Sequence, residues 1–125
     1  MSKLITEATE DSPSILFDGD LGIMEIKGKS LPEDAIVCYT PLYDAVSEYV
    51  KSPKDKTTVN LKLEYLNSSS AKKILKIINL LETLPPQGYA VDVFWYYNEN
   101  DEDMHEEGLE FRRLTTLQIK FEKEI

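Results

Sequence analysis

Five short apolar stretches along this 125-residue chain predict five β-strands. Apolar and polar residues alternate over residues 59–66 and again near the end of the chain, which is the pattern of strands with one covered face. The first two stretches flank the turn-forming sequence Asp18-Gly19-Asp20-Leu21-Gly22 and therefore predict a hairpin. The five stretches are residues 15–17, 23–26, 57–66, 89–96 and 117–121.

Helical spacing occurs in three other stretches. Pro41 opens the first, whose apolar positions are Leu42, Val46, Tyr49 and Val50. The second is the most amphipathic: residues 67–70, Asn-Ser-Ser-Ser, supply its N-cap, and residues 85–88 end it. The third lies in the acidic stretch 98–113, where a loop runs into a helix that Gly108 weakens. The apolar face of the second helix comprises Ala71, Ile74, Leu75, Ile77, Ile78, Leu81 and Leu84.

Alternation of strands and helices predicts an α/β fold. The order is ββαβαβαβ, with about five strands and about three helices in a mixed β-sheet that has at least some parallel pairs. The length is that of one ordinary domain, so we expect a single domain over residues 1–125. Residues 1–12 are polar and predict a loose lead-in, and residues 27–34 predict a loop.

The chain is acidic, with 14 Lys and Arg against 23 Asp and Glu and a formal net charge of −9. No Lys or Arg occurs between Lys76 and Arg112, whereas nine Asp and Glu residues do, so the excess negative charge is concentrated there. An acidic surface repels the phosphates of nucleic acids and of anionic lipids. We therefore expect no nucleic-acid partner.

Sequence features also bear on location. No stretch approaches the roughly 20 apolar residues that a membrane span needs, so we expect no membrane insertion. The N-terminus lacks the apolar segment of a signal peptide. A single cysteine, Cys38, excludes an internal disulfide and is compatible with a reducing compartment. These features predict a cytoplasmic protein.

No pattern for nucleophilic catalysis is complete. The single histidine, His105, lies in the acidic stretch, far in sequence from a candidate nucleophilic serine. Ser69 and Lys72 match a Ser-x-x-Lys motif, as do Ser70 and Lys73, but the Ser-Asp-Asn and Lys-Thr-Gly motifs that accompany it in penicillin-recognising enzymes are absent. We therefore predict that the protein is not an enzyme.

Metal-binding patterns are incomplete as well. Residues 98–109 resemble a calcium loop, but Asp103 and Leu109 occupy the positions that require Gly and Glu. No cluster of Cys and His could hold zinc, and no Gly-rich phosphate loop occurs. We expect neither a metal nor another cofactor.

The sequence Asn67-Ser68-Ser69-Ser70 has two interpretations. In one, Ser68 or Asn67 caps the helix and contributes about 1 kcal/mol to its stability. In the other, a phosphoryl group on a serine is held by the free N–H groups of the helix N-terminus, within reach of Lys72. The chemistry of the residues leaves both open.

A combination of motifs resembles the SiaC family of bacterial regulatory phosphoproteins. The resemblance runs over about residues 15–121 and is densest over 63–111. It implies a fold similar to STAS domains, the anti-sigma-factor antagonists. The residues that carry it are Tyr65-Leu66-Asn67-Ser68-Ser69-Ser70-Ala71-Lys72, Leu80-Leu81-Glu82, Gly88, Trp95-Tyr96-Tyr97 and Asp101-Glu102-Asp103-Met104.

The resemblance implies a partner-switching protein. In that family, a cognate Ser/Thr kinase phosphorylates a Thr in the matching stretch, and a PP2C-like phosphatase removes the phosphate. The unphosphorylated form binds an effector, which for the named member is a diguanylate cyclase that it activates, so the resemblance implies cyclic-di-GMP signalling. Ser68 occupies the position of the phosphorylated Thr, and Ser69 is the rival acceptor. Asn67, Ser69, Ser70 and Lys72 would then shape the surroundings of the phosphosite.

Trp95, Tyr97 and the acidic residues Asp101, Glu102 and Asp103 are the candidates for a docking surface. Alternation along the strand buries one of Trp95 and Tyr96 and exposes the other. An exposed aromatic residue beside acidic residues would anchor a partner with a basic face. Two alternatives remain open at this point: a constitutive scaffold in which Ser68 is only a helix cap, and a small Ser/Lys hydrolase.

Overall fold

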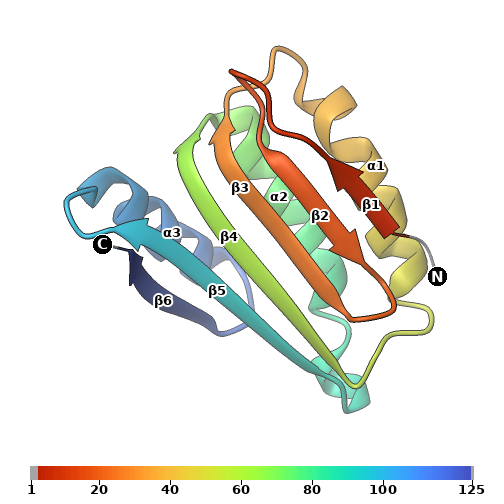
Figure 1. Cartoon of the computed structure of the whole chain (residues 1–125). Helices are drawn as coiled ribbons and strands as arrows, with labels where there is room; N and C mark the ends of the chain where they lie inside the picture. Colours follow the sequence, from red (N-terminus) through yellow and green to blue (C-terminus); the bar gives the residue numbers. More distant parts are fainter. Residues whose placement is uncertain (1–2, 125) are drawn as a thin grey trace.

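Six strands form one mixed sheet with three helices packed on it, in a computed structural model that describes residues 3–124 (Figure 1). The strand order β1-β2-β3-β4-β5-β6 follows the chain. Strands β1, β2 and β3 pair antiparallel, whereas β3, β4, β5 and β6 pair parallel. The elements are β1 (Lys3–Thr6), β2 (Ser14–Asp18), β3 (Ile23–Ser30), α1 (Ala35–Tyr49), β4 (Lys56–Leu66), α2 (Ser68–Leu81), a 3₁₀ turn (Pro85–Gln87), β5 (Ala90–Asn98), α3 (Glu102–Leu114) and β6 (Ile119–Glu124).

All three helices lie on the same face of the sheet (Figure 1). Each connects two neighbouring parallel strands, and successive strands are added in one direction along the sheet. Because β-α-β crossovers keep one handedness, helices added in this way fall on one side. No helix in the described part of the chain covers the other face.

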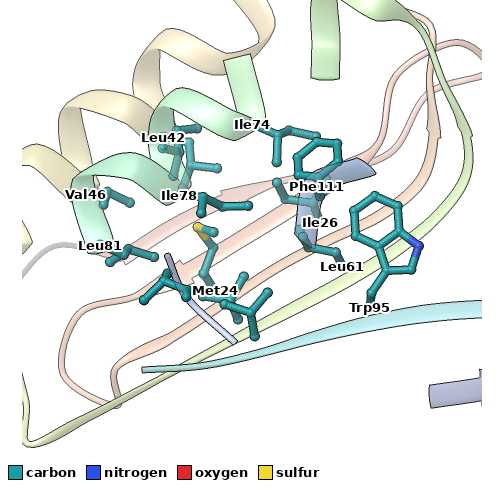
Figure 2. Close-up of a cluster of buried hydrophobic side chains, with 14 of the residues drawn as sticks. Met24, Ile26, Leu42, Val46, Leu61, Ile74, Ile78, Leu81, Trp95 and Phe111 are labelled. Atoms are coloured by element: carbon teal, nitrogen blue, oxygen red, sulfur yellow. The ribbon is translucent and has the colours of Figure 1, made fainter. Parts of the chain in front are cut away.

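The buried apolar residues form one cluster between the sheet and the helices. Figure 2 shows Leu42 and Ile78, from α1 and α2, above Met24 and Leu61 of the sheet. The predicted apolar face of the second helix is confirmed, because Ile74, Ile77, Ile78 and Leu81 of α2 are all buried.

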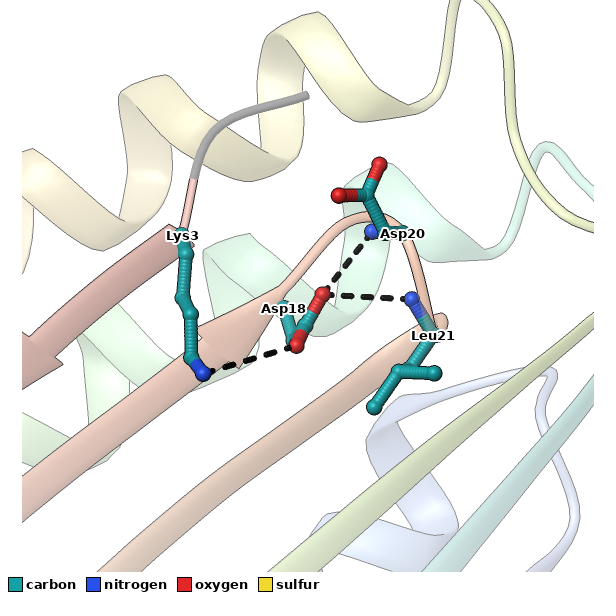
Figure 3. A network of polar contacts seen from close by, with 4 residues as sticks. All are labelled: Lys3, Asp18, Asp20 and Leu21. Carbon is teal, nitrogen blue, oxygen red and sulfur yellow. Dashed lines mark hydrogen bonds and ion pairs between the residues drawn. The ribbon is translucent and has the colours of Figure 1, made fainter.

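The predicted hairpin is confirmed and joins β2 to β3. One carboxylate oxygen of Asp18 accepts hydrogen bonds from the N–H groups of Asp20 and Leu21, at 3.0 and 3.2 Å (Figure 3). The other lies 3.9 Å from the Lys3 ammonium of β1. Gly22 follows with φ of 68°, and a Cβ there would meet the backbone oxygen of Lys56 at 2.7 Å, so the turn requires glycine.

The predicted mixed α/β fold is confirmed, but its first element was missed. A loose lead-in was expected over residues 1–12, of which 1–2 lie outside the described residues. Lys3–Thr6 instead form the edge strand β1, paired with β2. Four residues are too few to show the alternating pattern of a strand. The hydrogen bonds that hold this segment in the sheet come from its pairing with β2.

The prediction around Pro41 was also wrong. Strand β3 continues to Ser30, and α1 begins at Ala35, so the first half of the predicted loop is strand and Pro41 lies inside a helix. The start is set by Asp34, whose carboxylate accepts hydrogen bonds from the N–H groups of Ile36 and Val37 at 3.0 and 3.3 Å. The prediction gave too much weight to the preference of proline for a first helical position, because the Asp34 cap lies earlier in the chain than Pro41.

No helix among residues 3–124 combines the length and the apolar character needed to cross a bilayer.

Candidate functional site

The sequence Asn67-Ser68-Ser69-Ser70 lies at the carboxyl edge of the parallel strands, where β4 ends and α2 begins. In open α/β sheets, this edge is where ligands and partners are commonly bound. Strand β3 ends beside it at Ser30, whose backbone oxygen accepts a hydrogen bond from the Asn67 N–H at 3.0 Å. Strand β5 ends at the same edge and leads into α3.

Asn67 is the N-cap of α2. Its side-chain oxygen accepts a hydrogen bond from the Ser70 N–H at 2.8 Å, and its backbone oxygen accepts one from the Ala71 N–H at 3.0 Å. The predicted cap is confirmed, and of the two candidates it is Asn67 rather than Ser68. Ser68 occupies the first helical position instead. The interpretation in which Ser68 serves only as a cap is therefore wrong.

The three serines differ in their access to solvent. Ser70 is fully buried, and its hydroxyl accepts a hydrogen bond from the Ser30 hydroxyl at 2.8 Å. The Ser30 hydroxyl also lies 2.5 Å from the buried Tyr39 hydroxyl of α1. Burial raises the pKa of Tyr39 well above its usual range, so this network stays neutral. It ties β3, α1 and α2 together directly beneath the site.

Ser68 and Ser69 are exposed. Neither their hydroxyls nor their backbone N–H groups donate a hydrogen bond to another described residue. Lys72 is exposed one turn along α2 and lines a surface groove with Ser69. Within the described chain, no hydrogen bond links its ammonium group to any of the three serines.

Trp95 cannot contact a partner, because it is fully buried. Its indole N–H donates a hydrogen bond to the Met104 backbone oxygen at 3.0 Å, and its ring packs on Phe111 with centroids 4.9 Å apart. The prediction of Trp95 as a docking residue is therefore wrong. Alternation along β5 points Trp95 toward α3 and Tyr96 toward the uncovered face of the sheet.

Tyr97 points to the same side as Trp95 and is half-buried. Its ring stacks on His105 of α3 with centroids 4.6 Å apart, and Phe121 of β6 packs edge-on against it. The only histidine therefore belongs to an aromatic contact between α3 and the sheet.

The acidic segment begins α3. The Asp101 carboxylate caps this helix by accepting a hydrogen bond from the Met104 N–H at 3.0 Å. Glu102 and Asp103 lie in the first turn, where negative charge is favoured by the helix dipole, and both are exposed. Asp101 and Asp103 line a groove with Tyr65 and Leu66, so part of the acidic segment lies near the end of β4.

Several residues of this edge were missed by sequence reasoning. Tyr65 is 57% exposed at the end of β4, although it follows the buried Leu63 by two positions. The alternation of buried and less buried positions along β4 ends there, and the adjacent apolar residues Tyr65 and Leu66 were the available signal in the sequence. Ser30 and Tyr39 come from β3 and α1, and no sequence pattern links them to Ser70.

No group of three or more His, Cys, Asp or Glu residues within 3–124 is arranged to hold a metal ion. The half-buried thiol of Cys38 is free, and burial raises its pKa, which lowers its reactivity.

Comparisons with known proteins agree with this geometry. The model of the SiaC family of regulatory phosphoproteins matches residues 6–124. A protein of Pseudomonas aeruginosa strain UCBPP-PA14, described only as uncharacterized, is 31% identical over 112 residues, which cover 90% of this chain and 89% of that protein.

Two solved structures from Pseudomonas aeruginosa are similar over nearly their whole length. One chain of the complex of the diguanylate cyclase SiaD with its activator SiaC matches with a TM-score of 0.90 and 27% identity, and the match covers 97% of this chain and 99% of that chain. Apo-SiaC matches with a TM-score of 0.88 and 28% identity, covering 98% and 99%. The resemblance found in the sequence is confirmed: the chain belongs to the SiaC family of regulatory phosphoproteins.

Proposed function

We propose that this protein is a phosphorylation-controlled interaction switch with Ser68 as the acceptor. The unphosphorylated form binds and regulates an effector. A cognate Ser/Thr kinase adds the phosphoryl group, and a PP2C-like phosphatase removes it. The protein itself catalyses no reaction in this proposal and acts in the cytoplasm. Its membership of a family of regulatory phosphoproteins supports the proposal.

The observation that carries the proposal is the position of Ser68. The residue is exposed at the first position of α2, and Asn67 already caps the helix, so the Ser68 hydroxyl has no structural task in the described chain. A phosphoryl group there could accept hydrogen bonds from the N–H groups of Ser68 and Ser69. It would add roughly −1.5 to −2 charges to the surface without displacing a buried group.

We propose a diguanylate cyclase as the effector. The solved complex of SiaC with the diguanylate cyclase SiaD supports this class of partner, because the SiaC chain in that complex matches this fold over nearly its whole length. The protein would then control cyclic-di-GMP synthesis through binding alone.

Phosphosite mapping tests the acceptor. The protein is purified from its native host, and its intact mass is measured before and after treatment with a PP2C-type phosphatase. We expect a phosphatase-sensitive gain of one phosphoryl group on Ser68. Modification of Ser69 instead would transfer the role to the neighbouring exposed hydroxyl, whereas Ser70 is excluded by its burial.

A pair of variants tests the switch. Ser68→Asp adds a carboxylate at the first helical position, where negative charge is favoured, so the fold survives. We expect Ser68→Asp to weaken binding of the diguanylate cyclase and Ser68→Ala to preserve it. Unchanged binding by Ser68→Asp, with Ser68 unmodified in the host, would instead support a constitutive scaffold.

A further inference from the structure

Helix α1 exposes three large apolar side chains, although it buries Tyr39 and Leu42 in the core. Ile36 is 60% exposed and Tyr43 38%, and both line hollows beside α2, whereas Val37, 71% exposed, lines a separate hollow. A helix that packs on a sheet normally presents polar residues to water. Exposed apolar side chains that gather along a groove are typical of a surface that binds a partner.

The neighbouring helix α2 contributes a basic wall. It carries Lys72, Lys73 and Lys76 and no acidic residue from Ser68 to Leu81, although the whole chain has a net charge of −9. None of these lysines forms an ion pair with another residue of the described chain, whereas Lys56, Lys62 and Lys120 of the sheet all do.

The two helices enclose a surface groove, here called the α1–α2 groove. Two adjoining hollows form it and share Lys73 and Lys76. Glu33 and Asp34 close one end, where the Asp34 carboxylate is engaged in capping α1. Ser69 opens onto the groove beside Lys72, next to the proposed acceptor Ser68. The residues that define the groove are Ile36, Tyr43, Ser69, Lys72, Lys73 and Lys76.

We infer that the α1–α2 groove is the docking surface for the effector, and that its occupant is an amphipathic segment with apolar and acidic side chains. The apolar side chains would pack on Ile36 and Tyr43, and the carboxylates would pair with Lys72, Lys73 and Lys76. The inference rests on the proposed function, because it assumes that Ser68 is phosphorylated.

This chemistry also determines the direction of the switch. A phosphoryl group on Ser68 brings roughly −1.5 to −2 charges to the end of the basic wall. It would neutralise Lys72 and repel the carboxylates of the partner. The unphosphorylated form is then the one that binds.

Two other surfaces of the described chain have different properties. The groove of Tyr65, Asp101 and Asp103 is acidic, so a phosphoryl group nearby would strengthen its attraction for a basic partner and reverse the switch. On the uncovered face of the sheet, charges pair with one another: Lys62 lies 3.2 Å from Glu25, and Asp92 contacts two lysines.

Photo-crosslinking in the native host locates the docking surface. A photoreactive phenylalanine replaces Tyr43 in the α1–α2 groove or Tyr65 in the acidic groove of the full chain. Each is combined with Ser68→Ala or Ser68→Asp. We expect a crosslink from position 43 in the Ser68→Ala form that is lost with Ser68→Asp, and a crosslinked peptide with apolar residues beside Asp or Glu.

A phosphomimetic-sensitive crosslink only from position 65 would overturn the inference and leave the switch itself intact. The absence of any crosslink that responds to Ser68→Asp would instead contradict the proposed function, and the inference with it. The two failures are therefore distinguishable.

Binding measurements with the crosslinked protein supply matched controls. We expect Ile36→Asp and Lys73→Glu each to weaken its binding by about tenfold or more, as for central interface residues. The control variants are Leu21→Asp, at an exposed position of the β2–β3 turn, and Lys27→Glu, at an exposed position of the sheet. Each should keep the affinity within about twofold of the unchanged protein. Equal losses for groove and control variants would refute the groove as the docking surface.

Discussion

Replacement of Gly108 by alanine tests how closely α3 is seated on the sheet. Gly108 is buried on the side of α3 that faces β5 and β6. A Cβ at this position would lie 2.7 Å from both Cδ1 and Nε1 of Trp95 and 2.5 Å from Cε1 of Phe121. The indole cannot move away easily, because it is fully buried and its N–H is hydrogen-bonded to Met104.

Two opposing effects decide the outcome of Gly108→Ala. Alanine is favoured over glycine inside a helix by about 1 kcal/mol. Extra volume in a well-packed core costs about 1–3 kcal/mol, and the upper part of that range applies here because two of the three contacts are to a fixed ring. We expect a net loss of about 1–2 kcal/mol in the free energy of unfolding, or a melting temperature lower by about 4–8 °C.

Urea denaturation followed by tryptophan fluorescence measures this loss, since Trp95 is the only tryptophan and reports directly on the affected contact. Glu106→Ala, at an exposed position of the same helix, is the control and should change stability by less than about 0.5 kcal/mol. A Gly108→Ala protein as stable as the wild type would refute the close seating of α3 described above.

Two further predictions concern the cap of α2 and the charges of the sheet. Asn67→Ala should lower the free energy of unfolding by about 1 kcal/mol, whereas Ser68→Ala should change it by less than about 0.5 kcal/mol; equal losses in urea denaturation would mean that Ser68 shares the capping role. Hydrogen bonds from Lys120 and Lys56 lower the pKa of Asp92, so its stabilising effect is present above about pH 4 and is lost as the pH falls through the lowered value. Asp92→Asn should therefore lower the free energy of unfolding at pH 7, and the difference from the wild type should disappear in acid. A difference in the free energy of unfolding that does not change with pH would contradict the lowered pKa of Asp92.

Local patterns in the sequence predicted much of the fold. The hairpin at Asp18, the apolar face of α2 and its cap followed from residues within a few positions of one another. Helix α1 was placed too late because two local preferences competed: Pro41 favours a first helical position, but Asp34 caps the helix earlier. Edge strand β1 has too few residues for a pattern and exists through its pairing with β2.

Sequence by itself determined the family, the acidic character and the serine motif at the start of α2, because these depend on residue identity and short spacing. Only the tertiary structure decided which of these residues are accessible. Packing of α3 buried Trp95, and contact with Ser30 and Tyr39 buried Ser70, leaving Ser68 and Ser69 exposed. The α1–α2 groove has the same origin: Ile36 and Lys73 lie far apart along the chain, and their helices are neighbours only because both pack on one face of the sheet.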